Sequence, residues 1–229
     1  MARRIPEDRF EQLVRAATEV FIARGYRLTQ MSDVAEAVGV AKGTLYGYVD
    51  SKDALLTLCL TTADAPGPIA LPENLPLPTL EAGQLGQQVK AALSQETGLP
   101  LLSAAVARDH AEEPLEELRD IIGELFDLMY SNRHGIKLLD RCMDHPELVD
   151  LWQTHGREGP RLALARYLEK RIAGGQLREV ANLRLAARIV IETVATWAVH
   201  IHWDRAPEAF DHDEARATTI DFLVRGLRR

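Results

Sequence analysis

An all-α fold is predicted from three features of the sequence. Apolar residues recur at intervals of three and four along most of the chain, which is the spacing that gives a helix one apolar face. No stretch alternates apolar and polar residues as a half-buried strand does, and no segment repeats. Glycines and prolines stand at most of the expected helix boundaries. We therefore expect a small helix-turn-helix domain of three helices at the N-terminus, followed by a larger helical domain.

The composition is typical of a globular protein. The chain is 46% hydrophobic and 27% charged, which is enough apolar material to fill a core. No run of 18 apolar residues predicts a membrane span, and the first residues lack the apolar run of a secretory signal. Cys59 and Cys142 stand far apart without the spacing of paired ligands. We therefore expect a cytoplasmic protein with no disulfide and no zinc site.

The charge of the chain is unevenly distributed. The net charge of −7 by itself argues against a nucleic-acid partner. Residues 1–62, however, hold 8 basic and 8 acidic side chains, whereas residues 63–229 hold 19 basic and 26 acidic ones. An N-terminal domain of zero net charge, with Arg3 and Arg4 at its start, can therefore bind DNA although the rest of the chain is acidic.

The first 63 residues are expected to form four helices: the three of the helix-turn-helix and a fourth that follows them. The first helix has a single apolar stripe formed by Phe10, Leu13, Val14, Ala17 and Phe21. Gly25 suits its C-terminal cap, and Thr29 lies near the N-cap of the second helix. The second, third and fourth helices are expected at residues 31–38, 42–48 and 52–63.

Residues 64–83 are a proline-rich linker or loop. Their prolines are Pro66, Pro68, Pro72, Pro76 and Pro78. Prolines at this density exclude a regular helix, so the segment is either an irregular connection between two domains or a lid over a pocket. Helical patterning resumes in residues 84–229, which are expected to form the second domain. The helices predicted there span 84–96, 99–111, 114–131, 133–143, 146–173, 183–203 and 208–228.

Residues 34–48 have the spacing of a helix-turn-helix. Two helices that cross steeply need a small residue at their contact, which Ala35 supplies, and the turn between them needs a residue that tolerates positive φ, which Gly39 supplies. Leu45 then packs the second helix against the first. An ordinary pair of helices with exposed polar groups is the alternative interpretation of so short a pattern.

The residues between these packing positions suit DNA. The candidates on or near the exposed side of the second helix are Ala41, Lys42, Gly43, Thr44, Tyr46, Gly47 and Tyr48. Lysine, threonine and tyrosine side chains can contact phosphates or base edges, and glycines allow close approach. Thr29 and Lys52 are further candidates for contacts beside this helix, and Arg3 and Arg4 for the DNA backbone or the minor groove.

From Arg9 to Leu60 the sequence resembles the DNA-binding domain of the TetR family of transcriptional regulators. The matching stretches are Ala16-Ala17, Phe21, "RGY" at 24–26, Thr29, "DVAEAVGVAKGTLYGYV" at 33–49 and "SKDAL" at 51–55. Family members often have an aromatic residue or histidine where Gly47 stands, and Phe-Pro where Val49-Asp50 stand. These departures mean that an operator preference cannot be transferred from relatives.

Residues 138–180 are similar to the regulatory domains of some efflux-type regulators of the same family. The resemblance implies that residues 84–229 bind a small apolar or amphipathic effector. It also implies a homodimer formed through the C-terminal helices. The side chains expected to line an effector pocket are Leu101, Ala105, Arg108, Ile122, Phe126, Met129, Tyr130 and Arg141, each of which could equally be ordinary core or surface.

No motif in the chain predicts catalysis, a cofactor or a metal. His200 and His202 lie two residues apart and so point to different sides of a helix, which prevents them from holding one metal ion together. The sequence therefore predicts a regulator, in expectation a repressor, that binds double-stranded operator DNA as a homodimer and is released by an effector. Two alternatives remain open: a helical small-molecule-binding protein or enzyme whose helix-turn-helix is only structural, and a DNA binder without an effector.

Overall fold

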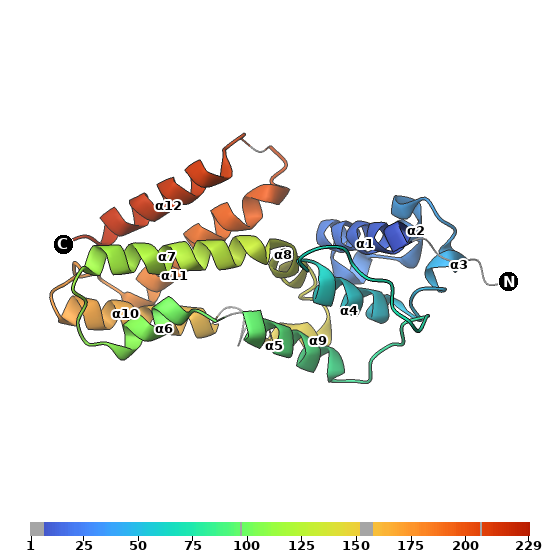
Figure 1. Ribbon diagram of the computed structural model, residues 1–229, viewed down its shortest axis with the longest axis horizontal. Helices are drawn as coiled ribbons and strands as arrows, with labels where there is room; N and C mark the ends of the chain where they lie inside the picture. The colour runs from blue at the N-terminus through green and yellow to red at the C-terminus, as the bar shows by residue number, and fades with distance from the viewer. Residues whose placement is uncertain (1–6, 97, 152–157, 207) are drawn as a thin grey trace. The chain divides into compact units, whose positions relative to one another are not determined.

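The computed structural model describes residues 7–96, 98–151, 158–206 and 208–229 (Figure 1). Within these residues the regular structure is twelve α-helices and one short 3-10 helix, without a strand, so the all-α prediction is confirmed. The one element of β-type pairing among them is an isolated parallel bridge between Val49 and Leu77. None of the described helices combines the length and the apolar character that crossing a membrane requires.

The chain forms two compact units. We call residues 1–93 with 134–152 the N-terminal unit, and residues 94–133 with 153–229 the C-terminal unit. The helix-turn-helix therefore shares a unit with a later segment, residues 134–152. The division at residues 63 and 83 predicted from the sequence concerns composition and function, and it stays a prediction.

The helices of the N-terminal unit come from two parts of the chain. They are α1 (Glu7–Leu28), α2 (Met31–Val38), α3 (Lys42–Leu45), α4 (Lys52–Thr62), most of α5 (Gln84–Glu96), α8 (Arg133–Arg141) and α9 (Pro146–Leu151). Helix α1 packs against α2 and α4. Its predicted apolar stripe is the centre of this core, since all five of its members are at most 1% exposed.

Gly25 sits where α1 meets the end of α8. Its φ of 76° interrupts the helical geometry of α1, which continues to Leu28. A side chain at this position would also come within 2.9 Å of the Arg141 carbonyl oxygen. The Arg141 side chain donates hydrogen bonds to the carbonyl oxygens of Ile22 and Ala23, at 2.8 and 3.0 Å. Glycine is thus needed both for the turn of the chain and for the close approach of α8.

The C-terminal unit is built around α7. Its helices are α6 (Pro100–Ala107), α7 (Pro114–Ser131), α10 (Gly159–Ala173), α11 (Leu183–Ala198), the 3-10 helix His200–Trp203 and α12 (His212–Leu227). Helix α11 packs against α7, α10 and α12, and α6 packs against α7 and α10. Leu118, Ile122 and Phe126 repeat at four-residue intervals on α7 and are fully buried, as its apolar stripe predicts.

Several predicted helix bounds differ from the structure. The third helix ends at Leu45 rather than Tyr48, because the N–H groups of Gly47 and Tyr48 bond to carbonyl oxygens three residues earlier rather than four. The segment predicted as one helix from 146 to 173 contains α9 and α10, with residues 152–157 outside the described part. The segment predicted as 183–203 is α11 followed by a separate 3-10 turn.

Candidate nucleic-acid interface

The turn between α2 and α3 has the geometry that the sequence predicts. Gly39 adopts φ 71° and ψ 39°, the left-handed conformation, and caps α2. The backbone N–H of Val40 donates to the Ala35 carbonyl oxygen at 2.9 Å, which closes the helix end. Ala35 is 4% exposed and Leu45 is fully buried. The small residue, the glycine and the anchoring leucine thus each occupy the position that a helix-turn-helix requires.

Helix α3 is short, and a tight turn extends it. After Leu45, the N–H groups of Gly47 and Tyr48 donate to the carbonyl oxygens three residues earlier, at 3.1 and 2.9 Å. We call residues 41–48 the reading segment. Its exposed members are Ala41, Lys42, Gly43, Thr44, Tyr46 and Gly47. Tyr46 leaves 43% of its surface exposed, and a side chain added at Gly43 would meet nothing within 4 Å.

Tyr48 points into the protein, so its predicted place on the exposed side of the segment is wrong. It is 3% exposed, and its ring stacks on Phe10 of α1 with 5.9 Å between ring centroids. Burial raises the pKa of its hydroxyl, and the positive charge of Arg9 offsets part of this rise. Because the chain leaves the α-helix after Leu45, residue 48 no longer follows the helical spacing that places it outward.

Thr29 and Lys52 hold the end of α1 together. Thr29 is 1% exposed and its hydroxyl donates to the Gly25 carbonyl oxygen at 2.7 Å. The Lys52 ammonium donates to the carbonyl oxygens of Tyr26 and Thr29 at 2.9 and 3.0 Å, and it stands 4.1 Å from the centroid of the Tyr26 ring. The Thr29 side chain is thus buried and already hydrogen-bonded, and its contact with DNA stays a prediction. The N-cap of α2 is Gln30, the residue after Thr29, and it forms a capping box with Asp33.

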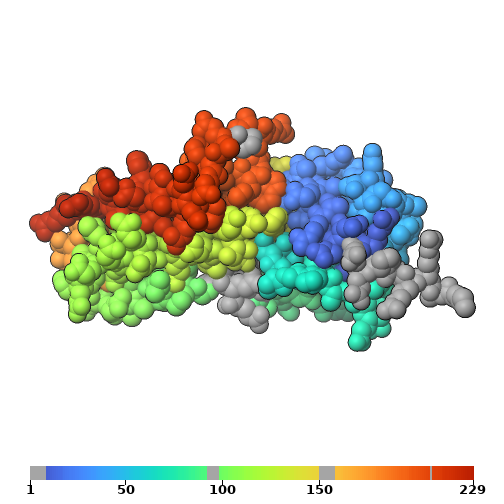
Figure 2. All heavy atoms as spheres, turned by 45° about the horizontal axis from the view of Figure 1, so that its top comes forward, coloured from blue at the N-terminus to red at the C-terminus, as the bar shows by residue number. Residues whose placement is uncertain are grey.

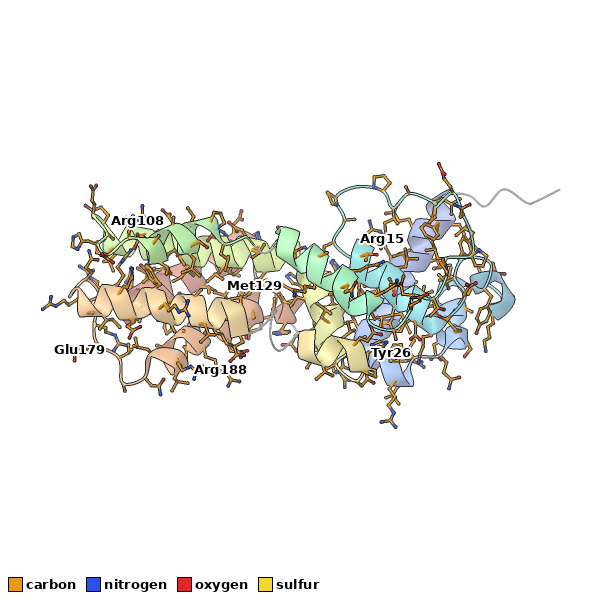
Figure 3. The ribbon with its side chains drawn as sticks, turned by 90° about the horizontal axis from the view of Figure 1, so that it is seen from below. Arg15, Tyr26, Arg108, Met129, Glu179 and Arg188 are labelled. Carbon is orange, nitrogen blue, oxygen red and sulfur yellow. The ribbon has the colours of Figure 1, made fainter. Side chains whose placement is uncertain are left out.

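Asp53 links α4 to the corner between α8 and α9. Its carboxylate accepts a hydrogen bond from the Tyr26 hydroxyl and lies 3.7 Å from Nε2 of His145. The rings of Tyr26 and His145 meet edge to face with 4.7 Å between centroids, and Figure 3 labels Tyr26 on α1. Burial, followed by the bond to Asp53, raises the pKa of Tyr26 well above its ordinary value. The phenol therefore stays protonated and remains a hydrogen-bond donor.

The effector candidates differ in how deeply they are buried, and two of the DNA candidates are not described. Arg3 and Arg4 lie outside the described residues. Among the effector candidates, Ala105, Ile122 and Phe126 are fully buried core, whereas Leu101 is exposed. Met129 and Tyr130 are half-buried at the end of α7, where the ring of His212 lies 3.9 Å from that of Tyr130.

The two arginines among the effector candidates have structural partners. Arg108 donates to Glu117 at 2.9 Å in the first turns of α7. Arg141 belongs to the N-terminal unit, where it donates to carbonyl oxygens of α1. From Glu117 to Met129 the helix rises about 18 Å, at 1.5 Å per residue. Figure 3 accordingly shows Arg108 and Met129 well apart. Within the C-terminal unit, Arg108 and Met129 therefore do not lie at one site.

A groove of about 450 Å³ lies between α6, α7 and α12. It is lined by Leu101, Arg119, Asp120, Gly123, Glu124, Asp127, Arg216, Ala217 and Ile220. Arg216 holds Asp127 through two hydrogen bonds at 2.6 and 2.7 Å, and the Glu124 carboxylate accepts from the first N–H groups of α6. Arg216, Asp127 and Glu124 therefore already have hydrogen-bond partners within the protein. Across the described residues, no group of three histidine, cysteine or acidic side chains is placed to hold a metal ion.

Known proteins resemble this chain along its length. Residues 13–59 match the model of the family described as "Bacterial regulatory proteins, tetR family". Two proteins of Bacillus subtilis (strain 168) align over 225 residues, which is 96% of this chain and 95% of each relative: the uncharacterized HTH-type transcriptional regulator YvdT at 26% identity and the fatty acid metabolism regulator protein at 23%. In fold, the chain resembles the ketosteroid transcriptional regulator KstR2 of Mycobacterium tuberculosis, with a TM-score of 0.58 and 17% identity, covering 99% of this chain and 97% of that one.

Proposed function

We propose that this member of the TetR family of transcriptional regulators is a ligand-responsive repressor that binds a pseudo-palindromic operator as a homodimer. The observation that carries the proposal is the reading segment. It presents Lys42, Thr44 and Tyr46 outward from a glycine turn while Leu45 fixes it to the core. These side chains can donate to phosphates and base edges when the segment enters a major groove.

A specific complex with DNA needs two copies of the reading segment. One reading segment offers few contacts, and a nanomolar affinity for DNA requires a larger interface than one small module provides. A dimer with two-fold symmetry places two segments in successive major grooves, about 34 Å apart. This spacing is why we propose a pseudo-palindromic operator.

The exposed faces of α11 and α12 support dimerisation through the C-terminal helices. Leu185 and Ile189 lie one turn apart on α11 and are 55% and 53% exposed, and Phe222 on α12 is 74% exposed. Figure 2 shows α12, in red, at the surface of the C-terminal unit. Large apolar side chains in this number on neighbouring helices are typical of an interface. Ile189→Asp with Phe222→Asp should convert a dimer to a monomer in sedimentation measurements.

The effector is proposed to be a small amphipathic molecule derived from a fatty acid. The relative named for fatty acid metabolism, which aligns over nearly the whole chain, supports this class. Such a molecule can release DNA only if it binds one arrangement of the dimer more tightly than the other. Candidate fatty acids and their thioesters would be added to a preformed protein–DNA complex, with loss of the complex as the result expected.

The proposal is tested by fluorescence anisotropy of the purified protein with labelled DNA. The operator would be recovered by selection from random-sequence DNA, and a scrambled duplex of equal length would be the control. We expect tight binding to the operator, weak binding to the control, and an affinity that falls steeply with salt. Absence of any selected sequence would contradict the proposal and favour a structural helix-turn-helix. A reporter gene placed behind the operator then tests whether binding represses transcription.

A further inference from the structure

The proline-rich segment contacts the end of the reading segment. We call residues 64–83 the strap. The N–H of Leu77 donates to the Tyr48 carbonyl oxygen at 2.8 Å, and the Leu77 carbonyl oxygen accepts from the Asp50 N–H at 2.9 Å. The hydroxyls of Ser51 and Thr79 lie 2.6 Å apart just beyond this bridge. The strap is thus paired with the backbone that connects the reading segment to α4.

Both ends of the strap are also held, by α8 and α9. At its start, the Asp64 carboxylate accepts from the N–H groups of His134 and Gly135, at 3.1 and 2.6 Å. At its end, the Glu147 carboxylate accepts from the N–H groups of Gly83 and Gly86, at 2.9 and 3.2 Å. Ile69, between the two ends, is 9% exposed. All these groups belong to the N-terminal unit.

The sequence of the strap favours this extended path. Leu77 stands between Pro76 and Pro78. A residue before proline is biased toward extended backbone, and proline restricts its own φ. The strap therefore loses little conformational entropy when Leu77 pairs with Tyr48 and Asp50. A flexible connection of the same length would not place its backbone so consistently.

The reading segment needs such support. Its α-helix comprises Lys42–Leu45 alone, and one helical turn is not stable in isolation. Its start is fixed by the turn at Gly39 and its middle by buried Leu45. At its far end the ring of Tyr48 packs on Phe10, and the backbone carbonyl oxygen of Tyr48 is bound by the strap.

We propose that the strap is a positioning element that fixes the orientation of the reading segment for specific DNA binding, with Leu77 as its central residue. The inference rests on the proposed function, because it concerns how the same segment reads DNA. The strap supplies orientation rather than a DNA contact, so its loss lowers the fraction of molecules that are competent for specific binding.

The test compares two substitutions at one position. Leu77→Pro removes the N–H that binds the Tyr48 carbonyl oxygen and keeps extended backbone. Leu77→Ala trims the side chain and keeps the N–H. For each variant, the affinity for the selected operator and for a scrambled duplex would be measured at equal salt. Hydrogen exchange of the amides of Tyr48, Val49 and Asp50 would be measured without DNA.

Leu77→Pro should lower the affinity for the operator about fivefold, the effect of losing about one backbone hydrogen bond. Affinity for the scrambled duplex should change by less than about twofold, because non-specific binding depends on charge. Exchange at Val49 and Asp50 should accelerate. Leu77→Ala should resemble the wild type in all three measurements.

A second variant, Glu147→Ala, removes the anchor at the far end of the strap without changing the reading segment. It should lower operator affinity in the same direction, and it decides the matter if Leu77→Pro does not fold. Unchanged operator affinity and exchange in both variants would overturn the inference. So would an equal loss for operator and scrambled DNA, which would indicate a direct backbone contact by the strap.

Failure of the proposed function has a different signature. If the wild-type protein binds no DNA and the Leu77→Pro variant exchanges faster at Asp50, the proposed repressor is refuted. The strap is then retained as a support for this segment. A wild-type protein that binds its operator while both variants match it would retain the repressor and refute the strap.

Discussion

Nε of Arg171 lies 2.7 Å from Oε1 of Glu117, and the arginine is completely buried. The same guanidinium donates to the carbonyl oxygens of Arg108 and Ala105, at 3.0 and 2.9 Å. One side chain on α10 thus binds the end of α6 and the first turns of α7. A buried charge is tolerated here because its donors meet acceptors and its charge meets a carboxylate.

Removing one member of this pair should destabilise the C-terminal unit. We expect Arg171→Met to lower the free energy of unfolding by about 3 kcal/mol, because two carbonyl oxygens lose their donor and Glu117 keeps only Arg108. Denaturant unfolding followed by circular dichroism measures the change. The control is Lys170→Ala, whose partner Asp109 is exposed, and this variant should unfold almost like the wild type. Equal stability of all three proteins would contradict the role assigned to Arg171.

The same pair makes stability depend on pH at the acid end. Burial disfavours the charge on Glu117, but the hydrogen bonds and charges of Arg171 and Arg108 outweigh it, so the pKa of Glu117 is lowered. The contribution of Glu117 to the free energy of unfolding is therefore complete above the ordinary glutamate pKa of about 4.3. It is lost as the pH falls through the lowered pKa of Glu117. We expect the difference in unfolding free energy between the wild type and Glu117→Gln to shrink over that acid range. A constant difference would show that the charge of Glu117 is not involved.

The two tyrosines of the reading segment should behave differently. Tyr46→Ala should weaken operator binding about fivefold, the loss of about one hydrogen bond to DNA, while leaving the fold intact. Tyr48→Phe should bind DNA almost normally, because the buried ring stays against Phe10. Tyr48→Ala should instead destabilise the domain by about 3 kcal/mol through the cavity it leaves. Anisotropy and thermal unfolding separate these outcomes; weaker DNA binding by a stable Tyr48→Phe would restore its hydroxyl as a contact.

Two glycines of the helix-turn-helix provide a matched comparison. Gly39→Ala should destabilise the domain by about 1 kcal/mol, because alanine is strained at a φ of 71°. Gly43→Ala should leave stability unchanged or slightly raise it, because this glycine lies within a helix and faces open space. The added methyl group should nevertheless weaken operator binding by keeping the segment from the bases. A stable Gly43→Ala variant with normal affinity would place Gly43 away from DNA.

Much of the fold could be predicted because it depends on local spacing. The stripe of α1, the bounds of α2 and α7 and the turn at Gly39 all follow from residues close together in sequence. The exposed residues from Ala41 to Thr44 follow from the same pattern. The burial of Tyr48 could not be predicted in this way, because the helical periodicity ends at Gly47, before Tyr48.

The contacts that could not be predicted join distant parts of the chain. Nothing near Leu77 indicates that it pairs with Tyr48, and nothing near Glu147 indicates that it binds Gly83. Arg171 has a charged side chain, so the apolar pattern of its helix predicts that it lies at the surface. Its burial depends on Glu117, which belongs to another helix. The effector residues were chosen by helical phase alone, which cannot tell a pocket wall from a packed core such as that around Phe126.

The most direct measurement is the salt dependence of operator binding by the wild type and by Lys42→Ala. Lys42 is the exposed cation of the reading segment, so its removal should weaken binding and reduce the slope of log affinity against log salt by about 1 in each subunit's contribution. Thermal unfolding should be unchanged. Identical slopes and affinities for the two proteins would show that residues 41–48 do not enter the DNA, and the placement of the reading segment would be wrong.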